Sequence, residues 1–215
     1  MIITIDGPAG AGKGTIATYL AEKYNLAYMD TGLLYRALSK KVIESGLDPQ
    51  VNHSEIIELA KQVTVMDTKI PGLRSEDVAA VGSCIAKISE VREELAVVQH
   101  GFIEDVRKTG QGAVMDGRDI GTVICPEAEC KLFITARPEV RSQRRALELE
   151  SKNAEAAAIA KQIAERDSSD TNRKVSPVIP AEDALVIDTS DMSIGEACAT
   201  ADKFFRSKCE WDSSF

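Results

Sequence analysis

The stretch GPAGAGKGT, residues 7–15, combines closely spaced glycines with one lysine. Glycines let a backbone turn sharply, so that successive N–H groups can surround a phosphate, and a lysine adds a point charge. The stretch lies between an apolar run and a helical pattern, which is the setting such a loop needs. A Gly-rich turn without a ligand is the alternative. The expected phosphate-binding residues are Gly7, Pro8, Ala9, Gly10, Ala11, Gly12, Lys13, Gly14 and Thr15.

This loop departs from the pattern G-x-x-x-x-G-K-[ST] at one position. Gly14 stands where a Ser or Thr normally follows the lysine, and the hydroxyl comes one residue later, on Thr15. In the pattern, that hydroxyl contacts the Mg²⁺ of a nucleotide. We expect the Thr15 hydroxyl to contact Mg²⁺, either directly or through a phosphate oxygen. The form G-x-x-G-x-G-K-G-T is similar to that of nucleoside monophosphate kinases.

Two further segments carry side chains that could bind phosphate. In DTGLLYR, residues 30–36, Arg36 offers a planar fork for an acceptor phosphate, although it could equally be a surface helix residue. In MDGRDIGT, residues 115–122, Arg118 could clamp phosphate and Asp119 could accept from an amine or a ribose hydroxyl. A salt-bridged turn is the alternative for that pair.

Arginines are concentrated in one part of the chain. Seven of the twelve lie between residues 118 and 173, in a chain of formal net charge −8. Arg166, Asp170 and Arg173 have the spacing i, i+4, i+7 and would share one helix face. The face is either an exposed stripe of ion pairs or a lid that closes over a phosphoryl group, and the concentration of arginines favours the lid.

Five short apolar runs predict the elements that position these residues: 2–5, 26–29, 113–115, 131–135 and 184–187. Helical patterns separate them, so we expect an α/β fold with a mostly parallel sheet. Three runs are followed by Asp and Gly, and the carboxyl ends of parallel strands are where such sheets bind ligands. We expect those ends to form one rim.

The rest of the chain is organised around this core. We expect one domain over residues 1–215, with a core of about 1–35, 113–149 and 177–215. Residues 36–112 are predicted to form a mostly helical insert that binds the acceptor. Residues 150–176 are predicted to form a helical lid.

Composition excludes several classes of protein. A chain of 215 residues with 44% hydrophobic and 28% charged residues is typical of a globular protein. Its negative charge argues against nonspecific nucleic-acid binding, which depends on Lys and Arg. Five cysteines without a C-x-x-C pair indicate reduced thiols, and no apolar run approaches a membrane span. No signal peptide is predicted, and we expect a cytoplasmic monomer.

Taken together, these segments resemble the cytidylate kinases of bacteria. The resemblance covers nearly the whole chain and rests on GPAGAGKGT, DTGLLYR, SCIAKISEVREEL, DGRDIGT, RSQRRALEL, ERDSSDTNR and SPVIPAEDALVIDTS. It implies a P-loop three-layer fold with a central five-stranded parallel sheet, an inserted acceptor-binding region and a helical lid. It also implies phosphorylation of CMP and dCMP by ATP and Mg²⁺.

The resemblance assigns roles to individual positions. The acceptor phosphate would be lined by Thr31, Tyr35, Arg36 and Arg118. The cytosine would face Ser83, Arg92 and Asp119. Asp170 would hold the ribose, and Arg166 and Arg173 would contact the nucleotide. Asp119 can accept from the cytosine amino group, whereas uracil presents the opposite donor–acceptor pattern at that edge.

Ser83 and Arg92 impose a geometric requirement. They are nine residues apart, about 180° around a continuous helix, so both can face one ligand only if the helix breaks between them. We expect Ser89 to be the N-cap of the second helix.

Two segments depart from the family. Ser168, Ser169 and Thr171 stand where the family often has more arginines, and the acceptor region is reduced to about MDTKIPGLRSEDV, residues 66–78. These departures leave the CMP-versus-dCMP preference and tolerance for UMP open.

The expected mechanism needs no general base, because the nucleophile is already a largely dianionic phosphate. Catalysis would come from positioning and charge neutralisation by Lys13, Arg118, Arg144 and Arg166. Asp30 or Asp116 could hold Mg²⁺ through water. The alternatives are a P-loop kinase with another acceptor, such as UMP, AMP or shikimate, and a non-catalytic nucleotide switch.

Overall fold

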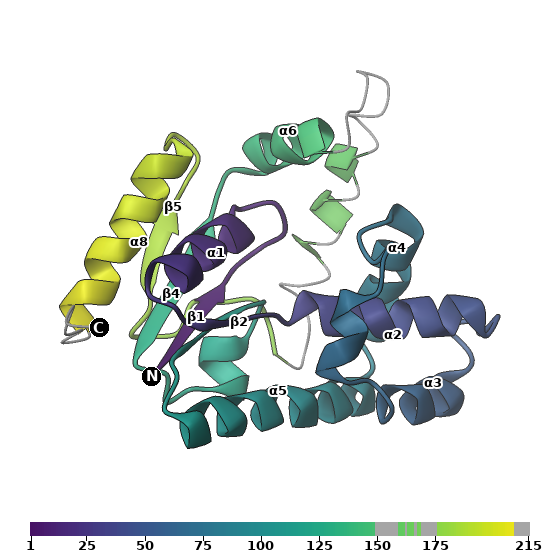
Figure 1. Cartoon of the computed structure of the whole chain (residues 1–215). Coiled ribbons are helices and arrows are strands. Elements are labelled where there is room, and N and C mark those ends of the chain that lie inside the picture. The colour runs from purple at the N-terminus through teal and green to yellow at the C-terminus, as the bar shows by residue number, and fades with distance from the viewer. Residues whose placement is uncertain (149–158, 162, 166, 169–175, 209–215) are drawn as a thin grey trace. The chain divides into compact units, whose positions relative to one another are not determined.

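A five-stranded sheet forms the centre of the larger of two units in the computed structural model (Figure 1). The structure describes residues 1–148, 159–161, 163–165, 167–168 and 176–208. The larger unit, unit 1, comprises Met1–Met29 and Gly110–Phe215, and unit 2 comprises Asp30–Thr109.

The predicted strands are all present, within one or two residues of the expected bounds. They are β1 (Ile2–Asp6), β2 (Ala27–Asp30), β3 (Ala113–Asp116), β4 (Cys130–Thr135) and β5 (Leu185–Asp188), in the spatial order β2-β3-β1-β4-β5. β1 runs parallel to β3 and to β4, and β4 runs parallel to β5. The expected five-stranded parallel α/β sheet is confirmed. Apolar runs form these strands because helices and loops cover the sheet, which hides the side chains of β1 on both faces.

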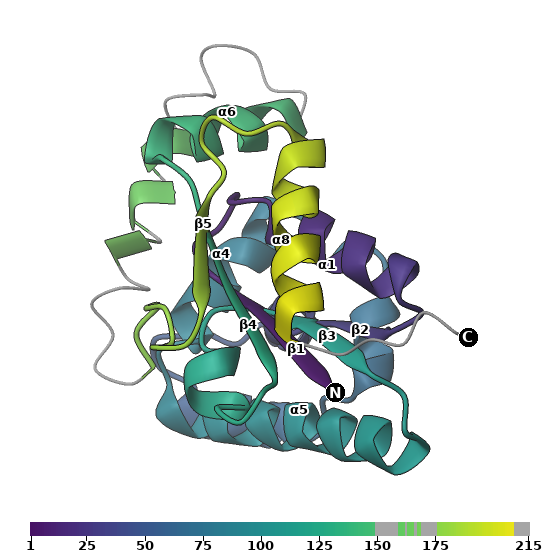
Figure 2. The ribbon, with the colours of Figure 1, turned by 90° about the vertical axis from the view of Figure 1, so that its left-hand side faces the viewer.

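One face of the sheet packs on α1 (Lys13–Lys23) and α8 (Ile194–Lys208), which lie side by side in both views (Figures 1 and 2). Ile3 and Ile5 of β1 join Ile16 of α1 and Phe205 of α8 in one buried cluster. This packing fixes α1 against the strand that leads into the glycine-rich loop.

The other face of β1 meets a short π-helix, η2 (Ile120–Ile124). Thr4 and Asp6 point to this face because side chains alternate along a strand. A Cβ on Gly121 would lie 2.7 Å from Thr4 Oγ1 and 3.3 Å from Asp6 Oδ2. Only a glycine allows the π-helix to approach this closely.

A third helix of unit 1, α6 (Pro138–Glu148), follows β4. Residues 159–161, 163–165 and 167–168 are also helical, and Ile159 and Ile163 are buried. The burial of these isoleucines shows that this helical segment packs on the protein through its apolar side.

Unit 2 is helical. It contains α2 (Gly32–Glu44), α3 (His53–Ala60), the 3₁₀-helix η1 (Val65–Lys69), α4 (Glu76–Ile85) and α5 (Ser89–Thr109). α2 packs against α4, and α3 packs against α5. A Cβ on Gly82 of α4 would lie 3.2 Å from Ser39 Oγ of α2, so this glycine permits the close packing of the two helices.

The helix break required between Ser83 and Arg92 is confirmed. α4 ends at Ile85 and α5 begins at Ser89. The predicted cap residue was wrong by one position: the Ile88 carbonyl accepts from the Arg92 N–H at 3.2 Å, so Ile88 is the cap and Ser89 is the first helical residue.

None of the helices in the described ranges combines the length and the apolar character that a bilayer span requires.

Candidate active site

The glycine-rich loop starts where β1 ends, and its conformation depends on glycine. Gly7 has φ +140°, and a Cβ there would collide with the carbonyl oxygen of Ile134. Gly10 has φ +73°, and its Cβ would lie 3.3 Å from the Cβ and from the carbonyl oxygen of Arg141. The loop is therefore pressed against β4 and α6, with no room for side chains at these two positions.

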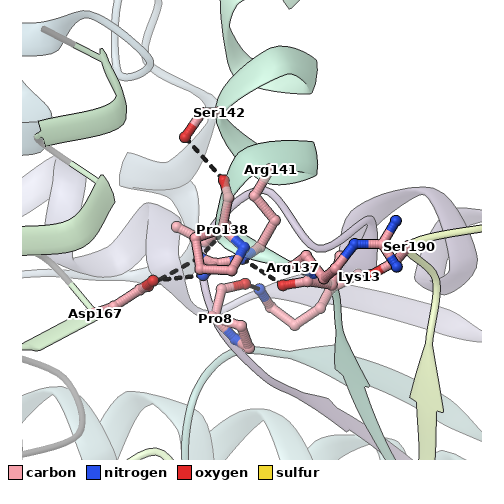
Figure 3. A network of polar contacts seen from close by, with 10 residues as sticks. Pro8, Lys13, Arg137, Pro138, Arg141, Ser142, Asp167 and Ser190 are labelled. Carbon is pink, nitrogen blue, oxygen red and sulfur yellow. Dashed lines mark hydrogen bonds and ion pairs between the residues drawn. The ribbon is translucent and has the colours of Figure 1, made fainter. Parts of the chain in front are cut away.

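The carbonyl oxygens of the loop are held by hydrogen bonds from the protein. Their donors are Lys13 Nζ to Pro8 (2.8 Å), Arg141 Nη1 to Ala9 (3.1 Å), Thr189 Oγ1 to Ala11 (3.0 Å) and the Ile16 N–H to Gly12 (3.2 Å). Figure 3 shows Lys13 folded back onto Pro8, with Arg141 beside it.

These bonds also orient the N–H groups of the loop. In a planar trans peptide the C=O and the following N–H point in opposite directions, and the described residues contain no cis peptide. Holding the carbonyls therefore turns the N–H groups of Ala9, Gly10, Gly12 and Lys13 away from their supports. Together with the N-terminus of α1, this arrangement suits a polyphosphate.

Arg144 lies against Thr189, the residue that holds the Ala11 carbonyl. Its Nη1 donates to Thr189 Oγ1 at 2.9 Å, and its Nη2 donates to the Thr189 carbonyl at 2.7 Å. Thr189 is buried. In this structure Arg144 thus supports the loop through Thr189, and its expected role in catalysis stays a prediction.

The space beside Gly14 is occupied by polar groups of two strands. A Cβ on Gly14 would lie 3.5 Å from Asp116 Oδ2 and 3.8 Å from Tyr28 Oη. The Tyr28 hydroxyl donates to Asp116 Oδ2 at 2.9 Å and so fixes the carboxylate. Thr15 is exposed on the first turn of α1. A carboxylate and a hydroxyl near a phosphate loop are oxygen ligands of the kind Mg²⁺ prefers.

Of the two carboxylates considered for Mg²⁺, only Asp116 lies beside the loop within unit 1. Asp30 belongs to unit 2, where its Oδ2 pairs with Arg74 Nη2 at 3.0 Å. The described residues contain no cluster of three or more His, Cys, Asp or Glu that could hold a metal without phosphates. Asp116 and Thr15 supply few ligands, so a Mg²⁺ held by them would keep most of its water.

Asp6 connects β1 to the DGRDIGT turn. Its carboxylate accepts from the N–H groups of Ile120 (2.9 Å) and Gly121 (2.7 Å). The pKa of Asp6 is raised to about 6, chiefly by burial and in part by the nearby charge of Asp119, while the two hydrogen bonds and the charge of Lys13 act in the opposite direction. Asp6 was not predicted as a site residue, although the Asp-Gly at the end of the first strand was its signal in the sequence.

Arg118 and Asp119 are held by this turn. Asp119 is buried, and its carbonyl accepts from the Val123 N–H at 2.9 Å. Arg118 is half-buried, and its Nη1 donates to the Gly117 carbonyl at 3.1 Å. Both residues belong to unit 1. Asp6 fixes the backbone of the turn that directly follows them, at Ile120 and Gly121.

Unit 2 contains several residues predicted to bind the acceptor, and two of them, Tyr35 and Arg92, are in contact. The Arg92 guanidinium stands over the Tyr35 ring, 5.9 Å from its centroid. Arg36 Nη1 donates to the Leu73 carbonyl at 2.9 Å, and Ser83 Oγ donates to the Ala79 carbonyl at 3.2 Å. Thr31 is buried just before α2. The predicted lid residues Arg166, Asp170 and Arg173 lie outside the described residues.

The sequence of the chain matches a known protein family. The family model for cytidylate kinase matches residues 3–207. A cytidylate kinase of Paramagnetospirillum magneticum is 46% identical over 203 residues, which cover 93% of this chain and 95% of that protein. One from Methylocella silvestris is 44% identical over 203 residues, covering 94% and 92%.

Solved structures support the fold. An uncharacterized protein from Eubacterium ventriosum superposes with a TM-score of 0.54 at 16% identity, covering 96% of this chain and 99% of that one. A sugar kinase from Janibacter sp. superposes with a TM-score of 0.51 at 13% identity, covering 95% and 94%. The sequence matches over nearly the whole length show that the chain belongs to the cytidylate kinase family.

Proposed function

We propose that this protein transfers the γ-phosphoryl group of ATP to the 5′-phosphate of CMP or dCMP. The anchored loop at residues 7–15, in a chain that belongs to the cytidylate kinase family, carries this proposal. The relatives named above are cytidylate kinases, which supports the choice of acceptor.

The donor's phosphates would bind to the N–H groups that the loop presents. Lys13 would exchange its bond to Pro8 for one to the β- and γ-phosphates, and its Nζ starts within the loop. When bound, Mg²⁺ would neutralise charge on the β- and γ-phosphates. Asp116 would hold it through water and Thr15 through its hydroxyl, as the position of Asp116 beside Gly14 supports.

The acceptor would be bound by side chains. We assign the cytosine amino group to Asp119, the other polar atoms of the ring to Ser83 and Arg92, and the phosphate to Arg36 and Arg118. Each of these side chains has the donor or acceptor type that its assigned group requires. The proposal includes the acceptor-binding role of the insert and the closing of the lid over the transferring group.

The reaction requires positioning rather than proton abstraction. The attacking oxygen belongs to a phosphate that is largely dianionic at neutral pH, so no base is needed. The residues assigned to the transferring group carry positive charge or present N–H groups, as an in-line transfer demands. Cationic side chains would neutralise the equatorial oxygens: Lys13, Arg118, Arg144 and Arg166.

A coupled assay with ATP and a panel of acceptors tests the proposal. We expect the highest kcat/KM with CMP or dCMP, a lower value with UMP, and little turnover of AMP or shikimate. Turnover of AMP or shikimate well above that of CMP would overturn the proposal in favour of another P-loop kinase. GTP binding without acceptor-dependent turnover would instead indicate a nucleotide switch.

We also propose that the active form is a monomer in the cytoplasm that acts on free nucleotides and not on nucleic acid. All the assigned residues come from one chain, so no second copy is required. Light scattering at the concentration of the assay tests the monomer, and a stable dimer would contradict it.

A further inference from the structure

Arg141 is a buried cation on α6 that the proposed reaction does not use. Its side chain is 4% exposed. A buried guanidinium is costly unless its donors are satisfied, and here several donors have protein partners. Nε donates to the Ala136 carbonyl at 2.8 Å, and Nη1 donates to the Ala9 carbonyl of the phosphate loop at 3.1 Å.

The remaining face of the guanidinium meets Asp167. Nη1 donates to Asp167 Oδ1 at 2.9 Å, and Nη2 donates to Asp167 Oδ2, so the pair is bidentate (Figure 3). Asp167 is 26 residues away in sequence, on the helical segment that buries Ile159 and Ile163. Arg141 therefore joins three parts of unit 1: the loop, α6 and this segment.

A second arginine–aspartate pair at the start of α6 provides a contrast. Arg137 forms a bidentate pair with Asp191, at 2.8 and 2.7 Å, but the two side chains are 51% and 80% exposed. Arg137 donates to Asp191 and, through its backbone N–H, to Ser190. None of these bonds goes to a carbonyl of the glycine-rich loop. Both pairs are bidentate, so their geometry is the same. They differ because Arg141 is buried and contacts Ala9, whereas exposed pairs such as Arg137–Asp191 contribute little to stability.

We propose that Arg141 is a positioning residue for the donor nucleotide, held in place by Asp167. Its bond to the Ala9 carbonyl fixes the peptide between Ala9 and Gly10 and so directs the Gly10 N–H toward the phosphates. Gly10 has no Cβ and lies against the backbone of Arg141, which keeps this peptide close to its support. Asp167 fixes the fork of the guanidinium from the opposite side and acts only through Arg141.

The inference rests on the proposed function, but binding of the donor can be measured without an acceptor. The experiment compares Arg141→Lys, Asp167→Asn and the double variant with Arg137→Lys and Asp191→Asn as matched controls from the exposed pair. Lysine keeps the charge of Arg141 but cannot make the bidentate contact and the Ala9 contact together. Affinity for a non-hydrolysable ATP analogue with Mg²⁺ is measured by calorimetry, and KM is measured separately for ATP and for CMP.

We expect Arg141→Lys to weaken analogue binding and to raise the KM for ATP roughly 10-fold, as expected for the loss of a charged hydrogen bond. The KM for CMP should change by less than about twofold. Asp167→Asn should show a smaller effect of the same kind. The double variant should match Arg141→Lys, because coupled residues are not additive. Both control variants should bind the analogue like the original protein.

The proposal would be overturned if Asp167→Asn and Arg141→Lys lowered the melting temperature but left analogue affinity unchanged. Arg141 would then be a structural residue. Additive losses in the double variant would overturn the claim that Asp167 acts through Arg141. If Arg141→Lys does not fold, Asp167→Asn still decides, because it keeps the buried Arg141 side chain and changes only its partly exposed partner to a residue of the same size. Failure of the original protein to phosphorylate CMP would refute the proposed function, while the binding measurements would still test Arg141.

Discussion

The glycine-rich loop of unit 1 and the residues of unit 2 proposed to bind the acceptor are held in different ways. In the loop, the backbone is held: four carbonyls accept hydrogen bonds from Lys13, Arg141, Thr189 and Ile16. In unit 2, side chains are held by the backbone: Arg36 donates to Leu73, and Ser83 donates to Ala79.

The two kinds of support imply two ways of recognising a nucleotide. Backbone N–H groups look the same in every residue, so a loop that reads phosphate with them depends on conformation and on glycine. Side chains differ in their donors and acceptors, so a base is read by residue type. A substitution at a residue assigned to one nucleotide should therefore change the KM for that nucleotide and not for the other.

The largest effect is expected at Lys13, the loop side chain proposed to bind the β- and γ-phosphates. Lys13→Ala should lower kcat on the order of 10² to 10³-fold, the usual result of removing one donor that stabilises developing charge. Steady-state kinetics with both nucleotides saturating measures this. Lys23→Ala, at the opposite end of α1, is the control. A near-normal kcat in Lys13→Ala would refute the assignment of the loop.

A selective effect on the acceptor is expected from Asp119→Ala. Losing a charged acceptor should raise the KM for CMP roughly 10- to 100-fold, while the KM for ATP stays close to its original value. The measurement is the KM of each nucleotide at saturation of the other. Equal rises in both values would show that Asp119 does not read the base and would remove the distinction between backbone reading of the donor and side-chain reading of the acceptor.

Asp6 should make the stability of unit 1 depend on pH. Its folded-state pKa of about 6 lies above the ordinary value of 3.8, so the folded protein binds the proton more tightly than the unfolded chain. The stability gained is fully present below the ordinary pKa and is lost as the pH rises through about 6. Lowering the pH from 7.5 to 5 should stabilise the protein by about 1.4 kcal/mol relative to Asp6→Asn.

Urea unfolding of the protein and of Asp6→Asn at both pH values measures this difference. Other carboxylates, such as Asp183 and Asp202, have lowered pKa values, so their contribution to stability is lost only below the ordinary value of 3.8, outside this pH range. A constant difference between the two proteins across the pH range would contradict the raised pKa.

The smallest effect is expected at Ser83. Ser83→Ala removes one neutral donor from the proposed base site, so the KM for CMP should rise about 2- to 10-fold without change for ATP. Ser89→Ala, at the start of α5, is the matched control because it lies near the same helix break. An effect of Ser83→Ala on ATP alone would place Ser83 on the donor side.

Local patterns predicted most of the fold. Buried strands are short apolar runs, which can be found in the sequence. The glycine-rich loop has a recognisable pattern, so the strand before it and the helix after it could be predicted. The helix break was predicted from the angle between Ser83 and Arg92, although the cap itself moved to Ile88. A single residue at a helix end depends on tertiary packing, which the spacing of residues does not contain.

The supports of the loop could not be predicted. Arg141 and Arg144 are three residues apart on α6, yet one holds Ala9 and the other holds Thr189. An arginine fork can reach many carbonyls, and only the folded chain selects among them. Tyr28 and Asp6 were missed for the same reason: their partners, Asp116 and the turn at Ile120, come from distant parts of the sequence.

The bond between Lys13 and Pro8 has a consequence for competition among anions. An incoming ion must exchange with a contact that the ammonium already makes at 2.8 Å, rather than fill a vacant position. A lone chloride or orthophosphate replaces that contact and meets few of the oriented N–H groups. A triphosphate would meet several at once, which would outweigh the exchange. We therefore expect the resting contact to favour ligands with several linked phosphates over simple anions.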